Sequence, residues 1–213
     1  MTNSTVPLAR LVAWLENYRT QVTEQRAYLT ELDSAIGDAD HGANMARGFA
    51  AVMAKLDEGA PATADELFKS VGMTLVTSVG GASGPLYGTF FLRMGMTAGA
   101  VTEFDGAALA AALRAGLDGI VARGKAELGD KTMFDALAPA LDAFDAALAE
   151  GKSPAEAAAT AASAAEKGRD ATEPLVARKG RASYLGERSA GHLDPGAASS
   201  ALLLRCLAQT LES

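Results

Sequence analysis

Apolar residues recur every three to four positions in successive segments along nearly the whole chain, a spacing that predicts amphipathic α-helices. Short β-branched runs such as 75–77 lie inside these helical patterns, so we expect no strand. The chain therefore predicts an all-α fold of about eight helices in a single domain over residues 1–213. Helix start signals divide the segments: Pro7 at a first helical position, capping boxes at 63–66 and 153–156, Asp105, and the Asp194-Pro195 pair.

The composition narrows the class of protein. Apolar residues make up 49% of the chain but aromatic residues only 6%, so alanine and glycine dominate the packing and favour closely spaced helices. The net charge of −7, from 19 basic and 26 acidic residues, argues against binding to nucleic acid or to an anionic membrane surface.

The location of the protein is also constrained. The single cysteine, Cys206, excludes an internal disulfide, and its apolar neighbours predict that it is buried. No signal peptide is evident in the N-terminal sequence. The most apolar window, 71–92, is interrupted by glycine and serine and does not resemble a membrane span. We therefore expect a cytoplasmic protein.

Three aspartates, Asp33, Asp38 and Asp40, lie close together between two helical segments, and Gly37 and Gly42 allow the connecting loop to bend sharply. We expect Asp33 on the last turn of the first helix and the other two on the loop. Carboxylates this close repel one another unless a cation neutralises them, and hard oxygen ligands suit Mg²⁺ or Ca²⁺ rather than zinc. A calcium EF-hand does not fit, because its glycine and its final glutamate are missing. A solvated aspartate-rich turn is the alternative.

Two further segments favour phosphate binding. The glycine-rich run at 80–85 precedes a helix, where backbone N–H groups and the helix dipole attract anions. The stretch 177–191 has no apolar period and carries Arg181 and Arg188 among glycines, and arginine forks match phosphate oxygens. Taken alone, the first segment also suits close helix packing and the second a solvated loop. Together with the aspartates they predict a Mg²⁺–nucleotide site without a P-loop.

The same residues resemble a known family, the nucleotide-binding L subunit of dihydroxyacetone kinase. The resemblance spans nearly the whole chain, with several motifs in the family's order. They are Gly-Asp-Ala-Asp-His-Gly at 37–42 followed by Asn44-Met45, Gly-Gly-Ala-Ser-Gly-Pro-Leu-Tyr-Gly at 80–88, Gly-Asp-Lys-Thr-Met at 129–133, Gly-Arg-Ala-Ser-Tyr-Leu-Gly at 180–186 followed by Arg188-Ser189, and Gly-His at 191–192 with Asp-Pro-Gly-Ala at 194–197.

The resemblance implies a barrel of eight antiparallel amphipathic helices with the nucleotide, ADP or ATP, at one end. It implies that Asp33, Asp38 and Asp40 hold two Mg²⁺ ions that bridge the phosphates. The resemblance also suggests Arg188 as a further phosphate contact. It assigns no certain catalytic residue to this chain. The implied nucleotide contacts are His41, Gly42, Ala43, Asn44, Ala82 and Ser83 on the phosphate side, Gly124 and Met133 beside the adenine, and Arg181, Asp194, Pro195 and Gly196 around the rest of the pocket.

The resemblance also implies partner subunits. In multi-subunit members of the family, bound ADP is rephosphorylated by a phosphotransferase-system subunit, and a second subunit holds dihydroxyacetone and receives the phosphoryl group. This chain lacks the family's substrate-binding domain, so we expect it to act only together with those partners. A homodimer is a further expectation.

Three alternatives fit the same residues. The first is a subunit of an ATP-dependent kinase for a related ketose or sugar-alcohol derivative, since the sequence does not identify the donor or the acceptor. The second is a non-catalytic divalent-ion or nucleotide-binding module, which would bind nucleotide without partner-dependent turnover. The third is a two-metal phosphatase, which would release phosphate from a generic ester without any partner.

Overall fold

The computed structural model describes residues 5–213, and within that range it contains nine α-helices, one 3₁₀-helix and two very short strands. The first four residues, which belong to the stretch searched for a signal peptide, lie outside the described residues. The elements in order are β1 (Val6–Pro7), α1 (Leu8–Glu24), α2 (Arg26–Ile36), α3 (His41–Glu58), α4 (Ala64–Ser78), α5 (Ser83–Ala98), β2 (Glu103–Phe104), α6 (Gly106–Gly124), α7 (Met133–Ala149), α8 (Pro154–Ala171), η1 (Arg181–Ser189) and α9 (Pro195–Glu212).

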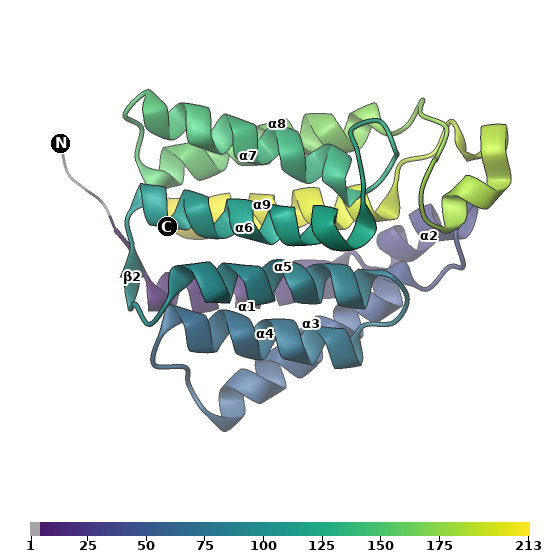
Figure 1. Ribbon diagram of the computed structural model, residues 1–213. Helices are drawn as coiled ribbons and strands as arrows, with labels where there is room; N and C mark the ends of the chain where they lie inside the picture. The colour runs from purple at the N-terminus through teal and green to yellow at the C-terminus, as the bar shows by residue number, and fades with distance from the viewer. Residues whose placement is uncertain (1–4) are drawn as a thin grey trace.

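Eight of the described helices form a closed ring, and α2 lies at one end of it (Figure 1). Each helix from α3 to α9 packs on the next, α9 packs on α1, and α1 closes the ring against α3. The α1 and α9 helices are antiparallel: the Trp14 indole N–H donates to the Leu203 carbonyl, and the Tyr18 hydroxyl donates to the Ser199 carbonyl. The expected all-α barrel is therefore confirmed, with α2 as an additional helix.

One hydrophobic core fills the ring, and small residues let neighbouring helices approach closely. A Cβ at Gly72 of α4 would stand 2.7 Å from the carbonyl oxygen of Gly88 on α5, so these two backbones pack directly against each other. Gly116 of α6 leaves room in the same way for the ring of Phe90. The expectation that glycine and alanine dominate the packing is confirmed by these contacts and by the buried alanines of α8.

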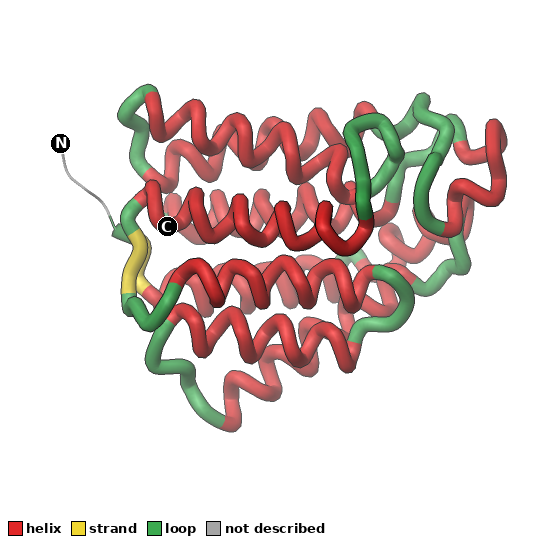
Figure 2. The backbone as a smooth tube through the Cα atoms, viewed as in Figure 1, coloured by secondary structure: helices red, strands yellow, loops and turns green. Residues whose placement is uncertain are grey.

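The two strands lie at the end of the ring opposite α2, where Val6 pairs with Phe104 and Pro7 with Glu103 (Figure 2). The expectation of no strand is wrong for these four residues, because a two-residue strand is too short to show an alternating pattern. Pro7 accordingly precedes α1 instead of forming its first turn, since its backbone is extended.

Besides Pro7, three of the four other helix-start signals agree with the structure. The box at 153–156 forms, and Asp105 and Asp194 cap α6 and α9 through their carboxylates. The box at 63–66 does not form: the Thr63 hydroxyl donates to Asp65, and the Glu66 carboxylate accepts the N–H of Ala62. A competing aspartate two residues along thus takes the threonine side chain away from the helix end.

Two segments expected to be loops are partly helical. The glycine-rich run ends earlier than expected, because α5 begins at Ser83, and the stretch 177–191 contains the 3₁₀-helix η1. Cys206 is buried, as expected. Among residues 5–213, no helix combines the length and the apolar character needed to cross a membrane.

Candidate functional site

A cavity of about 510 Å³ opens at the end of the ring where α2 and η1 lie. Figure 1 shows α2 at this end. This volume is in the range typical of small-molecule sites. Its walls come from the loops that follow α2, α4 and α6, from η1, and from the first turns of α5, α7 and α9. The cavity therefore brings together segments that are spread over most of the chain.

The three aspartates form one wall of the cavity. One carboxylate oxygen from each of Asp33, Asp38 and Asp40 lies within 4.8 Å of the others. Asp33 is on the last turn of α2, as expected, and its buried Oδ2 accepts the backbone N–H groups of Asp40 at 2.8 Å and His41 at 3.0 Å. These bonds hold the loop against the helix end, and the grouped oxygens fit a hard divalent cation.

The shape of the aspartate loop depends on its smallest residues. Gly37 must lack a side chain, because a Cβ there would stand 2.0 Å from Oδ1 of Asp33. Ala39 has a left-handed backbone, with φ of 60°, which is unfavourable for a residue other than glycine. Strain of this kind persists where the surrounding contacts fix the backbone, and it is frequent at binding sites.

Arg181 reaches the aspartates from η1. Its guanidinium lies 3.0 Å from Oδ2 of Asp38, while two-thirds of its side chain (67%) is exposed. An exposed ion pair of this kind contributes little to stability. The ion pair does, however, place the Arg181 cation beside the aspartate carboxylates. Arg188, in the same segment, does not line the cavity.

His41, the first residue of α3, is buried and held through both ring nitrogens. Its Nδ1 lies 3.2 Å from Oγ of Ser83, and its Nε2 lies 2.9 Å from Oγ of Ser199. Ser199 also bonds the hydroxyl of Tyr87, which bonds Ser200 in turn. Burial lowers the pKa of His41, against the opposing effect of two nearby aspartates. A neutral imidazole thus links the cavity wall at Ser83 to a hydroxyl network in the core.

The glycine-rich loop before α5 is supported from behind by α3. A Cβ at Gly80 would stand 2.9 Å from the amide nitrogen of Asn44. The Asn44 Oδ1 accepts from the Arg47 guanidinium at 2.6 Å, and Arg47 Nε donates to the Ser78 carbonyl at 3.0 Å. Residues 80–83 line the cavity, so the start of α5 is part of its wall. Helix starts of this kind attract anions.

Another part of the lining is apolar and lies where α5, α6, α7 and α9 meet. Gly124 ends α6, and a Cβ there would lie 3.4 Å from Leu86 of α5. Gly196 lies against α7 in the same way, with its own Cβ position 3.5 Å from the Cβ of Met133. These contacts bring the ends of α5, α6, α7 and α9 together around an apolar part of the cavity. The apolar residues that line this part include Leu86, Ile120, Met133 and Pro195.

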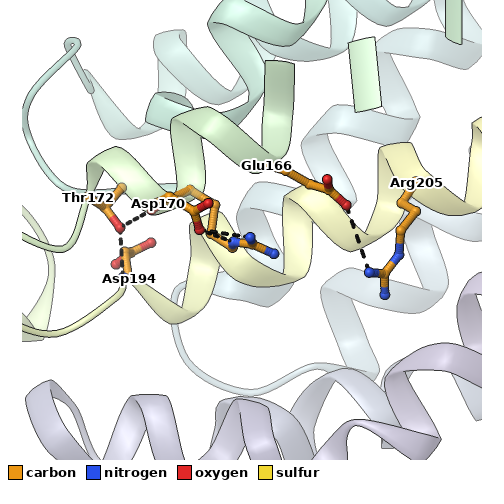
Figure 3. Close-up of polar contacts among 6 residues, drawn as sticks. Glu166, Asp170, Thr172, Asp194 and Arg205 are labelled. Atoms are coloured by element: carbon orange, nitrogen blue, oxygen red, sulfur yellow. Dashed lines mark hydrogen bonds and ion pairs between the residues drawn. The ribbon is translucent and has the colours of Figure 1, made fainter. Parts of the chain in front are cut away.

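Asp194 is a buried carboxyl group on the cavity wall at the start of α9. Its Oδ2 accepts the N–H of Ala197 at 2.7 Å, and its own N–H donates to the Thr172 hydroxyl at 3.0 Å (Figure 3). Burial raises the pKa of Asp194 to about 7, against the lowering effect of the Ala197 N–H. With this pKa, Asp194 changes charge near neutral pH.

Figure 3 also shows the ion pair, 3.8 Å long, that joins Arg205 of α9 to Glu166 of α8.

The structure brings twelve of the fifteen expected site residues to the cavity wall. Gly42, Ala43 and Asn44 are the exceptions. Gly42 faces α2, where a Cβ would meet the Arg26 carbonyl at 2.1 Å, and Ala43 lines a separate shallow groove. The contact of each residue with a nucleotide stays a prediction. The twelve are Asp33, Asp38, Asp40, His41, Ala82, Ser83, Gly124, Met133, Arg181, Asp194, Pro195 and Gly196.

Several lining residues were not among those expected. Lys131 and Thr132 lie inside the Gly-Asp-Lys-Thr-Met motif, so the motif itself was a signal for them. Leu86 belongs to the glycine-rich motif in the same way. Ile120 is one of many apolar residues on the stripe of α6, and no local pattern distinguishes it from a core residue.

The fold and the cavity define a class of protein: an all-α barrel with a carboxylate-lined pocket at one end. Comparison with known proteins gives the family, because the model of the DAK2 domain matches residues 35–209. The chain belongs to the DAK2 domain family.

Relatives and solved structures agree with this assignment. The chain is 46% identical to the PEP-dependent dihydroxyacetone kinase 1, ADP-binding subunit DhaL, of Listeria innocua, over 92% of this chain and 93% of the relative. It is also 46% identical to the corresponding ADP-binding subunit of Escherichia coli, over 93% and 95%. The crystal structure of the dihydroxyacetone kinase from C. freundii in complex with AMP-PNP and Mg²⁺ superposes with a TM-score of 0.71 at 28% identity. That match covers 98% of this chain and 35% of the longer kinase.

Proposed function

We propose that the chain is the ADP- or ATP-binding subunit of a multi-subunit dihydroxyacetone kinase and is active only together with its partner subunits. The observation that carries this proposal is the cluster of three carboxylates beside Arg181 in the cavity. It is supported by the identity of 46% to subunits named as ADP-binding, over nearly the full length of both chains.

The residues of the cavity fit a Mg²⁺–nucleotide. Asp33, Asp38 and Asp40 would hold Mg²⁺, and we propose two ions. When bound, Mg²⁺ neutralises charge on a transferring phosphoryl group. Arg181 and the start of α5 would bind phosphate oxygens, and the apolar space around Met133 would take the adenine. The chain would therefore contribute positioning and electrostatic stabilisation, which are the main sources of catalysis in phosphoryl transfer.

The partners in this proposal follow from the relatives. A separate subunit would hold dihydroxyacetone and present its hydroxyl group to the cavity. The Listeria and E. coli relatives are named PEP-dependent, which favours a phosphotransferase-system subunit over free ATP as the phosphoryl donor. In that arrangement the nucleotide stays bound and alternates between ADP and ATP.

A reconstitution experiment tests the proposal. The purified chain with bound ADP and Mg²⁺ is combined with a dihydroxyacetone-binding subunit and a phosphotransferase-system donor subunit in its phosphorylated form, and the formation of dihydroxyacetone phosphate is followed with each component omitted in turn. We expect product only when all three proteins and Mg²⁺ are present. Bound nucleotide without turnover in any combination would indicate a binding module. Release of phosphate from a generic ester by the chain alone would indicate a phosphatase instead.

A further inference from the structure

Lys131 is a buried lysine at the edge of the cavity. Its side chain is only 1% exposed, although lysine is among the residues that are least often buried. Its ammonium donates to four backbone carbonyls: Thr172 at 2.8 Å, Leu175 at 3.0 Å, Glu173 at 3.2 Å, and His192. Three of these carbonyls belong to the turn after α8, and the fourth belongs to the loop before α9.

The four carbonyls form a cage for a compact cation. An ammonium has three N–H donors and no acceptor, so with four oxygens around it one N–H is shared between two carbonyls. Rings of backbone carbonyls bind monovalent metal ions by the same chemistry. Burial lowers the pKa of Lys131, against the opposing charges of Asp194 and Glu173. The Lys131 ammonium thus binds at a point where carbonyls of the turn after α8 and of the loop before α9 converge.

The backbone at Lys131 is held in an unfavourable conformation. Its φ is 63°, in the left-handed region that a residue other than glycine rarely adopts. The flanking residues fix this turn: the carbonyl of Asp130 accepts the N–H of Arg178, and Thr132 forms a capping box with Asp135 at the start of α7. Such strain persists where neighbouring contacts determine the conformation, which is common at ligand sites.

The cage connects the segments that enclose the apolar part of the cavity. Met133 follows Lys131 by two residues, and Asp194 follows His192 by two. The cage turn also holds Asp194 directly, because the Thr172 hydroxyl accepts the Asp194 N–H. The contacts of Lys131 therefore tie the segment that carries Met133 to the start of α9, in addition to the direct packing of α7 on α9.

We propose that Lys131 is a positioning residue for nucleotide binding: its ammonium ties the turn after α8 and the loop before α9 to the loop before α7, and so fixes the space for the base. This inference rests on the proposed function. It concerns the base and not the phosphates, because the aspartates and the start of α5 make no contact with the cage among the hydrogen bonds of residues 5–213.

Calorimetry on the full chain with two ligands tests the proposal. The ligands are Mg²⁺–ADP and Mg²⁺–pyrophosphate, which share phosphates but differ in the base. For Lys131→Met we expect ADP affinity to fall by about tenfold or more while pyrophosphate affinity stays within about twofold of wild type. The control is Lys125→Met, because Lys125 lies in the same loop with a left-handed φ of 49° but is exposed. It should leave both affinities unchanged.

Chemical rescue separates positioning from a general loss of structure. Lys131→Ala removes three methylenes and the ammonium, so added propylammonium should enter the cage and restore ADP affinity, whereas propanol should not. Wild-type ADP affinity in Lys131→Met, equal losses for ADP and pyrophosphate, or no rescue by propylammonium would each overturn the proposal. Failure of the wild-type chain to bind either ligand would instead overturn the proposed function.

Discussion

At the level of single residues, Arg181 has the contact that bears most directly on phosphoryl transfer, because its guanidinium already lies against Asp38. Arg181→Lys keeps the charge but loses the planar fork that binds two oxygens. We expect turnover with the partner subunits to fall by about tenfold or more, and ADP affinity to fall less, since charge shifts most in the transition state. Arg188→Lys, in the same segment but off the cavity, is the matched control. Wild-type turnover in Arg181→Lys would contradict a phosphate contact and indicate that Arg181 is a solvated surface residue.

Asp194 predicts a pH dependence of stability. Its pKa in the folded chain is about 7, above the ordinary value of 3.8, so between these values the folded state binds more protons than the unfolded state. Asp194 therefore contributes most to the free energy of unfolding below about pH 4, and this contribution is lost as the pH rises to about 7. The slope is up to about 1.4 kcal/mol per pH unit. Asp194→Asn keeps an acceptor for the Ala197 N–H and should remove this slope.

Urea unfolding of the nucleotide-free chain at pH 5, 6 and 7 checks this expectation. The quantity to compare is the free energy of unfolding of wild type minus that of Asp194→Asn, because other titrating groups cancel in the difference. We expect this difference to decrease as the pH rises. A difference that is constant over the three pH values would show that Asp194 does not carry a raised pKa.

The aspartates could be recognised from the sequence because three acidic residues stand within eight positions between two helical stripes. Lys131 could not be recognised in this way. Its role depends on four backbone carbonyls that lie more than forty residues further along the chain. Every residue has a backbone carbonyl, so no sequence pattern identifies these four. Residues that bind through their own side-chain chemistry are thus predictable, whereas those that act on distant backbone are not.

At the level of helices, the close packing of α4 on α5 depends on glycine. Gly72→Ala would place a Cβ 2.7 Å from the Gly88 carbonyl and 2.6 Å from Leu92. We expect a loss of about 1–3 kcal/mol in the free energy of unfolding, because overpacking against backbone outweighs the gain of about 1 kcal/mol in helix propensity. Gly59→Ala is the control, since no atom lies within 4 Å of its Cβ position.

Denaturant unfolding of the two glycine variants provides this comparison. Gly72 does not line the cavity, so ADP affinity should be the same as wild type in both variants. Equal stability of Gly72→Ala and Gly59→Ala would contradict direct backbone packing between α4 and α5.

Helices were predictable here because each one buries an apolar stripe that repeats over several turns. The exceptions are elements without such a repeat. The strands β1 and β2 have two residues each, and η1 has only two buried residues among nine. The box at 63–66 failed for a local reason, since Asp65 takes the Thr63 hydroxyl. Short elements and competing side-chain bonds are therefore the limits of prediction from the pattern.

At the level of the whole molecule, the ring of eight helices collects at one end loops that are far apart in sequence. Amphipathic stripes predict which face of each helix is buried, but they do not determine the order in which the helices close the ring. The resemblance supplied a barrel of eight antiparallel helices, and the structure adds the order in which they pack. The cavity and the grouping of its walls depend on the closed ring, so residues of one local segment could not reveal them.

The central claim is that this cavity binds a Mg²⁺–nucleotide through the aspartate cluster. Titrating ADP into the purified chain by calorimetry, with and without Mg²⁺, tests it most directly when wild type and Asp38→Asn are compared. We predict tight binding by wild type that requires Mg²⁺, and a loss of about tenfold or more in Asp38→Asn with unchanged helix content, because one ligand charge is removed from a loop. Equal ADP affinity of the two proteins in the presence of Mg²⁺ would contradict the claim.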